Sequence, residues 1–262
     1  MKLIIDNLSF AYKCEAVLND VSFRVEKKEL LSILGPNGVG KTTLLKCINR
    51  VLKAQKGAVF VGTHNLFEMS ASEIAKNVSY VPQHANSSRL TAYDAILMGR
   101  RPYINWRVSQ RDYDIIENII QRLDMGSLAL RYIDEMSGGE LQKVCIARAL
   151  VQDPDVILMD EPTASLDLRN QLEILTLIRE IVERDDIITV MSIHDINTAL
   201  RFSEKLLFVK DGRIHSAIAP SQIDEKVIED VYGVRVKIHE IDHCPVVFPL
   251  ETIVKEKSNG GN

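Results

Sequence analysis

The chain has 262 residues, of which 46% are hydrophobic and 26% charged, the balance of an ordinary globular protein. Its formal net charge of −4 provides no general basic field, so we expect no nucleic-acid partner. No apolar run is long enough to cross a bilayer, Asp6 comes too early for a signal peptide, and the four cysteines are widely spaced, which together predict a reduced cytosolic protein.

Short apolar stretches in the first part of the chain predict strands at residues 3–5, 21–25 and 30–34. The last of these runs directly into the glycine-rich segment Gly35–Thr43, and a helix is expected from Lys41 to about Arg50. Strand, glycine loop and helix in this order are the context in which G-x-x-x-x-G-K-[ST] marks a phosphate-binding P-loop rather than a chance turn. Another strand is expected at 78–81, where Pro82 ends it.

Residues 84–154 have a different character, since apolar residues recur at helical spacing. Residues 112–123 form one amphipathic stripe, and residues 141–150 form a second one after Ser137-Gly138-Gly139. We expect this stretch to be an inserted helical subdomain.

Strands and helices then alternate. Strands are expected at 156–159, 187–193 and 206–209, and an amphipathic helix at 172–183. The pattern predicts an α/β fold with a mostly parallel sheet, antiparallel strands at the N-terminus and helices on both faces. We expect a nucleotide-binding core at 1–83 and 155–215, and a small C-terminal β extension at 216–262 whose tail, 258–262, is disordered.

The P-loop residues suggest how a nucleotide binds. Glycines let backbone N–H groups turn toward phosphate oxygens, and the following helix adds partial positive charge. Lys41 supplies a full charge to the β- and γ-phosphates, Thr42 a hydroxyl to Mg²⁺, and Thr43 a donor to the α-phosphate. The candidate ATP-binding residues are Gly35, Pro36, Asn37, Gly38, Val39, Gly40, Lys41, Thr42 and Thr43.

Two acids, Asp160 and Glu161, end the apolar strand at 156–159. Ligands of α/β sheets bind at the carboxyl ends of strands, so Asp160 is a candidate for holding Mg²⁺ through water and Glu161 for polarising the attacking water. A helix cap beside a solvated acid is the alternative for the pair, and the P-loop disfavours it.

Three single residues are further candidates. His194 follows the strand at 187–193 and could contact the γ-phosphate, although a lone histidine often caps a helix instead. Gln83, after Val81-Pro82, could bridge to Mg²⁺ as both catalytic residue and metal ligand. Tyr12 could stack on adenine, or simply pack against a strand.

The order and spacing of these motifs resemble the ATP-binding subunits of ABC transporters over about residues 1–215. The resemblance implies that Tyr12 stacks on adenine, that Gln83 is the Q-loop residue and that His194 is the switch histidine. It also implies that Ser137, Gly138 and Gly139, here called the signature loop, contact the γ-phosphate held by a second copy's P-loop, beside Asp167 of the D-loop. Two ATP molecules would then lie between the subunits of a head-to-tail homodimer, at the cytoplasmic face of the cell membrane.

The signature loop departs slightly from the family pattern. Met136 replaces a leucine, a nearly isosteric change, and Glu140 replaces a glutamine. We expect the charge of Glu140, near an anionic ligand, to weaken closure slightly.

Residues 90–103 resemble the subgroup that imports iron–siderophore, haem or cobalamin-type chelates. The resemblance implies that an integral membrane permease docks near Arg100, Arg101, Tyr103 and Trp106, while an external substrate-binding protein delivers cargo to that permease. Alternatively, the two aromatic residues pin a loop and the arginines are solvated.

His239-Glu240-Ile241-Asp242-His243 fits the zinc-protease pattern H-E-x-x-H. That chemistry requires a helix, whereas the alternating residues from Val234 predict a strand, on which positions four apart are about 13 Å apart. A surface zinc site at His243 and Cys244 is the alternative that stays open.

Two other functions compete with a transport ATPase. A soluble ABC ATPase acting on DNA or ribosomes usually has a long coiled coil or two nucleotide domains per chain, and this sequence has neither. A P-loop kinase would leave Ser137-Gly138-Gly139 unexplained.

Overall fold

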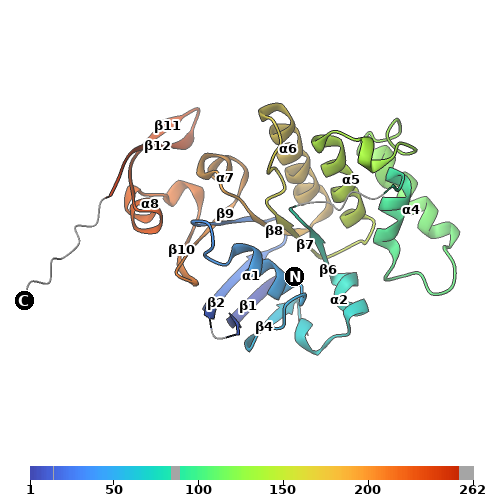
Figure 1. Ribbon diagram of the computed structural model, residues 1–262, viewed down its shortest axis with the longest axis horizontal. Coiled ribbons are helices and arrows are strands. Elements are labelled where there is room, and N and C mark those ends of the chain that lie inside the picture. The colour runs from blue at the N-terminus through green and yellow to red at the C-terminus, as the bar shows by residue number, and fades with distance from the viewer. Residues whose placement is uncertain (14, 84–88, 254–262) are drawn as a thin grey trace, which may run out of the picture.

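The computed structural model describes residues 1–13, 15–83 and 89–253, so the predicted tail at 258–262 lies outside the described residues. Figure 1 shows the helical region around α4 and the C-terminal elements at opposite ends of the molecule, with the sheets between them. None of the described helices is long and apolar enough to cross a membrane.

A six-stranded sheet forms the centre and has the order β10-β9-β3-β8-β7-β6. Neighbouring strands from β9 to β6 are parallel, and β10 adds an antiparallel edge. Its strands are β3 (Leu30–Leu34), β6 (Val78–Val81), β7 (Val156–Asp160), β8 (Ile188–Ser192), β9 (Lys205–Lys210) and β10 (Arg213–Ile218). Strands β3, β7 and β8 are buried throughout, which explains their continuous apolar sequences and confirms the predicted parallel sheet.

A second sheet is antiparallel, as predicted for the N-terminal strands, and has the order β2-β1-β4-β5. Its strands are β1 (Lys2–Tyr12), β2 (Glu15–Glu26), β4 (Lys56–Val61) and β5 (His64–Asn65). Strands β1 and β2 extend beyond the predicted stretches 3–5 and 21–25, their pairing is irregular at three places, and several of their polar residues are exposed.

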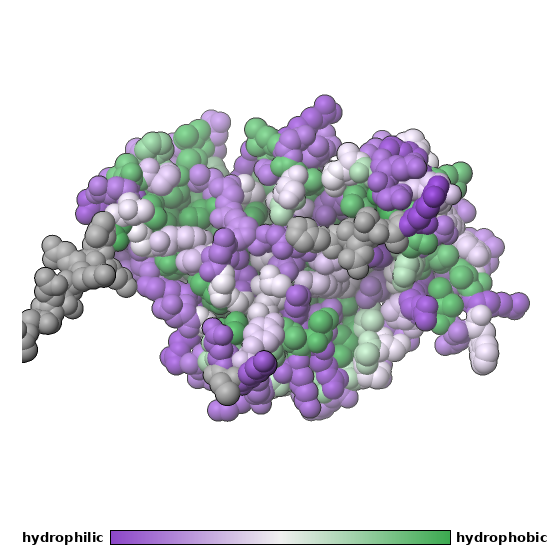
Figure 2. Space-filling view, in the orientation of Figure 1, coloured by the Kyte–Doolittle hydropathy of each residue, from purple (hydrophilic) through white to green (hydrophobic). Residues whose placement is uncertain are grey.

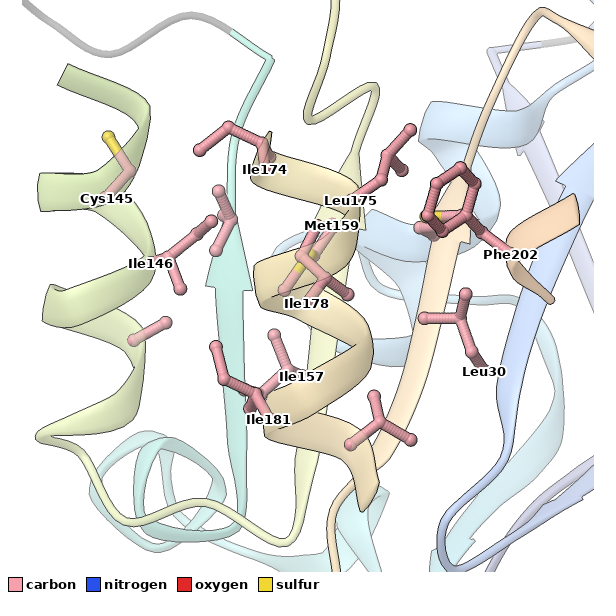
Figure 3. Close-up of a cluster of buried hydrophobic side chains, with 14 of the residues drawn as sticks. Leu30, Cys145, Ile146, Ile157, Met159, Ile174, Leu175, Ile178, Ile181 and Phe202 are labelled. Carbon is pink, nitrogen blue, oxygen red and sulfur yellow. The ribbon is translucent and has the colours of Figure 1, made fainter. Parts of the chain in front are cut away.

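Two apolar clusters cover the two faces of the parallel sheet. Since neighbouring side chains on a strand alternate, Leu158 faces the cluster shared with α1 and the antiparallel sheet, whereas Ile157 and Met159 face the other cluster. Figure 3 shows this second cluster, where Ile178 of α6 lies over Ile157 and Met159. The core therefore fixes β7, and with it the acids at its end.

Four of the eight α-helices in the described residues were expected, namely α1, α4, α5 and α6, whereas α2, α3, α7 and α8 were not. The eight are α1 (Lys41–Ile48), α2 (Ala71–Asn77), α3 (Ala92–Leu97), α4 (Gln110–Arg122), α5 (Gly138–Leu150), α6 (Leu168–Asp185), α7 (Ile196–Phe202) and α8 (Glu225–Tyr232). Short 3₁₀ turns join some of them, at Leu66–Glu68, Met98–Arg100, Ile133–Glu135 and Pro220–Gln222. The division into core, helical subdomain and extension stays a prediction.

The C-terminal segment contains a helix, α8, before the predicted strands. Helix α8 ends at Gly233, whose φ of 67° begins the reversal into the hairpin of β11 (Val234–Ile241) and β12 (Cys244–Thr252). His239 lies on β11 and His243 in the turn, so the H-E-x-x-H pattern is not helical. Among the described residues, no cluster of three or more acidic, histidine or cysteine side chains suits a metal ion.

Candidate active site

The P-loop leaves the carboxyl end of β3 in a conformation that depends on two of its glycines. At Gly35, a Cβ atom would lie 2.3 Å from the carbonyl oxygen of Val209 on β9. Gly40 begins α1 with a φ of 102°, which L-residues rarely adopt. The loop therefore passes close to the sheet and enters the helix with its backbone N–H groups free of side-chain caps.

Lys41 lies almost buried, on the first turn of α1. Its ammonium group donates hydrogen bonds to the carbonyl oxygens of Gly35, at 2.7 Å, and Pro36, at 3.0 Å. Burial lowers the pKa of Lys41, and the nearby carboxylates of Glu161 and Asp160 oppose that effect. The lysine thus places its charge inside the loop.

Asp160 is held by three hydroxyl groups from three different elements. Thr42 donates to Oδ1 at 2.9 Å, Ser192 donates to the same atom at 2.7 Å, and Tyr80 donates to Oδ2 at 3.1 Å. Burial, together with the Asp160 carboxylate, raises the pKa of Tyr80 and keeps its hydroxyl a donor. The sequence prediction identified Thr42 and Asp160 but missed Tyr80 and Ser192.

Of these two residues, Ser192 could have been predicted from the sequence. Ser192 is a polar residue at the carboxyl end of a mostly apolar strand, and it pairs with Asp160 across β8 and β7. Tyr80 gave no such signal, since tyrosine is common in half-buried strands.

The side chains of Gln83 and His194 both contact the carboxylate of Glu161. The amide nitrogen of Gln83 donates to one Glu161 oxygen at 2.5 Å, and Nε2 of His194 contacts the other. The backbone N–H of Glu161 donates to Ser192 at 3.0 Å, at a left-handed φ of 47°. The structure thus brings three predicted residues together, and places Gln83 on Glu161 rather than on Thr42 or Asp160.

Tyr12 lies apart from these groups, at the end of β1. Its ring is about half exposed and meets Phe10 edge to face, with 4.7 Å between the ring centroids. An exposed aromatic face of this kind is available for stacking.

The signature loop starts helix α5. Ser137 caps the helix, and its backbone N–H and its hydroxyl both donate to a Glu140 oxygen at 2.8 Å. Arg131 donates to the other oxygen at 2.8 Å. These groups, the Ser137 backbone N–H first, lower the pKa of Glu140. The capping box and Arg131 therefore pair the Glu140 carboxylate within the chain, and its expected weakening of closure stays a prediction.

Ser137 and Gly138 are exposed, whereas Gly139 is buried against α6. A Cβ at Gly139 would lie 2.6 Å from the side-chain oxygen of Asn170, whose backbone N–H donates to Asp167 at 2.8 Å. The signature loop and Asp167 therefore form one surface. Within residues 1–13, 15–83 and 89–253, no hydrogen bond joins this surface to the P-loop.

The structure corrects the prediction for Arg100. Its guanidinium is buried, donates to Asp112 at 2.9 Å and to the Val151 carbonyl at 2.7 Å, and covers the Tyr103 ring at 4.0 Å. Tyr103 is partly buried and donates to the Gln152 carbonyl at 3.0 Å. Arg100 is therefore part of the interior, while Arg101 and Trp106 are exposed.

The fold and these contacts are those of a P-loop nucleotide-binding domain. The family model described as "ABC transporter" matches residues 18–164, more than half of the chain. The chain therefore belongs to the ABC transporter family.

Individual relatives agree with this. The chain is 45% identical to an uncharacterized ABC transporter ATP-binding protein of Methanocaldococcus jannaschii, over 95% of this chain and 98% of that protein. It is 33% identical to a petrobactin import ATP-binding protein of Bacillus subtilis, over 90% and 95% of the two chains. A solved structure of an ABC transporter of proposed metal-chelate type, in an inward-facing conformation, superposes with a TM-score of 0.82 at 25% identity, over 95% of this chain and 97% of that chain.

Proposed function

We propose that this chain is the ATP-hydrolysing subunit of an importer for chelates of the iron–siderophore, haem or cobalamin type. The observation that carries the proposal is the convergence of Gln83 and His194 on Glu161, next to the Lys41 loop and Asp160. Similarity to the petrobactin import subunit, and to a structure of proposed metal-chelate type, supports the cargo class.

The residues present fit ATP and Mg²⁺. The glycine loop offers backbone N–H groups, Lys41 its charge and Thr43 a hydroxyl, while Tyr12 offers a ring for the base. The oxygens of Thr42 and Asp160, 2.9 Å apart, are the hard ligands that Mg²⁺ prefers. Bound Mg²⁺ supplies charge that offsets the phosphate oxygens.

Glu161 is the proposed general base. Gln83 and His194 each hold one of its oxygens, so the carboxylate is oriented before a water molecule is polarised. His194 is about half exposed, and in the proposed reaction it also donates toward the γ-phosphate. We propose Gln83 as the residue that couples this carboxylate to the helical region.

The signature loop serves a second copy of the chain in this proposal. Ser137 and Gly138 are exposed at the start of α5, where the positive end of the helix dipole attracts an anion. In a head-to-tail homodimer, this surface and Asp167 would face the triphosphate held by the partner's P-loop.

A permease would dock on the surface next to α3. A hollow of about 450 Å³ is lined by Asp94, Leu97, Met98, Arg101, Ile104, Asn105 and Val108. Met98 is 58% exposed and Trp106 fully exposed, and interface anchors are commonly of these types together with arginine. Such docking would hold the chain at the cytoplasmic face of the membrane, where an external binding protein affects it only through the permease.

The test is phosphate release by the purified chain with ATP and Mg²⁺. We expect Lys41→Ala to lower the rate at least about a hundredfold, because it removes the charge that faces the phosphates. Exposed Lys53→Ala is the control and should keep the wild-type rate. Full turnover by Lys41→Ala would exclude the P-loop role, and failure to co-purify with a co-expressed permease would argue against transport.

A further inference from the structure

The C-terminal hairpin is bonded directly to the helix that follows His194. Asn197 lies in the first turn of α7, three residues after His194. The backbone N–H of Val247 on β12 donates to its Oδ1 at 2.7 Å, and its Nδ2 donates to the Val247 carbonyl at 3.1 Å. One side chain thus pairs with both backbone groups of a strand residue, as a neighbouring strand would.

The same segment forms one wall of a hollow below the hairpin. This space, about 310 Å³, is lined on one side by His194, Asp195 and Asn197, and on the other by Tyr232, Val236 and Val247. Figure 1 shows α7 beside the C-terminal elements, and Figure 2 shows hydrophobic residues gathered over β11 and β12. The loop of His194 is therefore shared between the active site and the hairpin.

The loop that carries His194 is held more firmly on its N-terminal side than on its C-terminal side. Before His194, the backbone is fixed, because Ile193 donates to the Ile33 carbonyl at 3.2 Å inside the sheet. After it, α7 has only seven residues, too few to be stable alone, so its direction depends on tertiary contacts. Asp195 caps the helix, but only the Asn197 pair connects its first turn to β12 by side-chain hydrogen bonds among the described residues.

We propose that Asn197 is a positioning residue, through which the β11–β12 hairpin holds His194 against Glu161. This inference rests on the proposed roles of His194 and Glu161. With the Val247 bonds in place, α7 starts at a fixed position and His194 reaches the carboxylate. Without these hydrogen bonds, the start of α7 shifts and His194 no longer contacts the Glu161 carboxylate. The P-loop is unchanged.

The test compares Asn197→Ala with Arg201→Ala, an exposed change on the same helix. We expect Asn197→Ala to lower kcat about tenfold, with KM for ATP within about twofold, since one or two hydrogen bonds orient the catalytic group but do not bind nucleotide. In a His194→Ala background, the same substitution should have no further effect. A full additional tenfold loss in that background would overturn the proposal, because Asn197 would then act independently of His194.

A second measurement does not depend on catalysis. The imidazole signals of the six histidines can be resolved by NMR, and the His194 signal is assigned from its absence in His194→Ala. We expect this signal to shift and broaden in Asn197→Ala, to change less in Asn197→Asp, which keeps an acceptor for Val247, and to stay in place in Arg201→Ala. An unchanged His194 signal in folded Asn197→Ala would overturn the proposal, whereas an inactive wild-type chain would count against the proposed function alone.

Discussion

Both oxygens of the buried Asp160 carboxylate are occupied, and this fixes its orientation. Thr42 and Ser192 share one oxygen and Tyr80 binds the other. A buried carboxylate needs such partners, because an unpaired one is costly to desolvate. Tyr80 is the single donor to its oxygen within the part of the chain that the structure describes, so its loss leaves that oxygen without a side-chain hydrogen bond.

We therefore expect Tyr80→Phe to raise the Mg²⁺ concentration needed for half-maximal ATPase activity about tenfold, the effect of losing one hydrogen bond to a charged group. A Mg²⁺ titration of phosphate release measures it. Tyr113→Phe, on α4, removes a hydroxyl away from Asp160 and should leave the titration unchanged. An unshifted midpoint in Tyr80→Phe would mean that Thr42 and Ser192 suffice.

These contacts also show which site residues a sequence can reveal. Lys41, Thr42, Asp160 and Glu161 lie in continuous motifs beside predicted strands and helices, so local sequence was enough to make them candidates. Tyr80 contacts Asp160 only because β6 and β7 are neighbours in the sheet, although 80 residues separate the two side chains. Strand order is a tertiary property, and no local periodicity encodes it.

At the scale of elements, the buried Arg100–Asp112 pair ties three parts of the helical region together. Asp112 accepts from Arg100 and also caps α4 with Ser109, whose hydroxyl donates to it at 2.6 Å. Arg100 in turn reaches the end of α5 through the Val151 carbonyl. Removing the carboxylate leaves a buried guanidinium without its counter-charge.

We expect Asp112→Ala to lower the free energy of unfolding by about 3 kcal/mol, the usual cost of breaking a buried ion pair from one side. Urea denaturation measures the change. Arg169→Ala, in the exposed pair with Glu173, should change stability by less than about 0.5 kcal/mol. Equal effects of the two substitutions would show that burial of the Arg100 pair is unimportant.

The stabilisation that the Asp112 carboxylate contributes depends on pH. The Ser109 hydroxyl, together with Arg100 and against burial, lowers the pKa of Asp112 from its ordinary value of 3.8. Because the folded-state pKa is the lower one, the stabilisation is complete above the ordinary, unfolded-state pKa of 3.8 and is lost as the pH falls from there through the folded-state pKa. The stability difference between the wild type and Asp112→Asn should therefore shrink below about pH 4.

The strength of the local sequence pattern decides how much of the fold could be predicted. Strand β6 and helix α4 were predicted within about two residues, since their apolar residues repeat clearly. Helices α2, α7 and α8 have seven or eight residues, and α2 buries only Ile74, so they carry too little periodic signal. The burial of Arg100 was also beyond prediction, because it depends on Asp112 and Val151 meeting in space.

At the scale of the whole molecule, the chain carries two separate surfaces for one proposed reaction. The P-loop and Glu161 lie at the ends of β3 and β7, whereas Ser137 and Gly138 are exposed at the start of α5. A single copy does not join them by hydrogen bonds within the described residues. If the signature loop acts on a triphosphate, it acts on one that another copy holds.

We accordingly expect Glu161→Gln to form a stable dimer with ATP and Mg²⁺. The substitution removes the proposed base, so the closed state accumulates, while Lys41 and the signature loop are unaltered. Light scattering of the purified chain should give twice the monomer mass with ATP, and the monomer mass with ADP. A monomer under both conditions would contradict a shared site.

The decisive control is Gly138→Asp in the Glu161→Gln background. Gly138 is exposed, and its added Cβ would approach only the flexible end of Leu166, at 3.0 Å. An acid in the first turn suits the helix dipole, so α5 should stay folded, yet its charge opposes a triphosphate brought by the second copy. We expect this double variant to remain monomeric with ATP. If it dimerises as well as Glu161→Gln does, the two copies meet through a surface other than the signature loop.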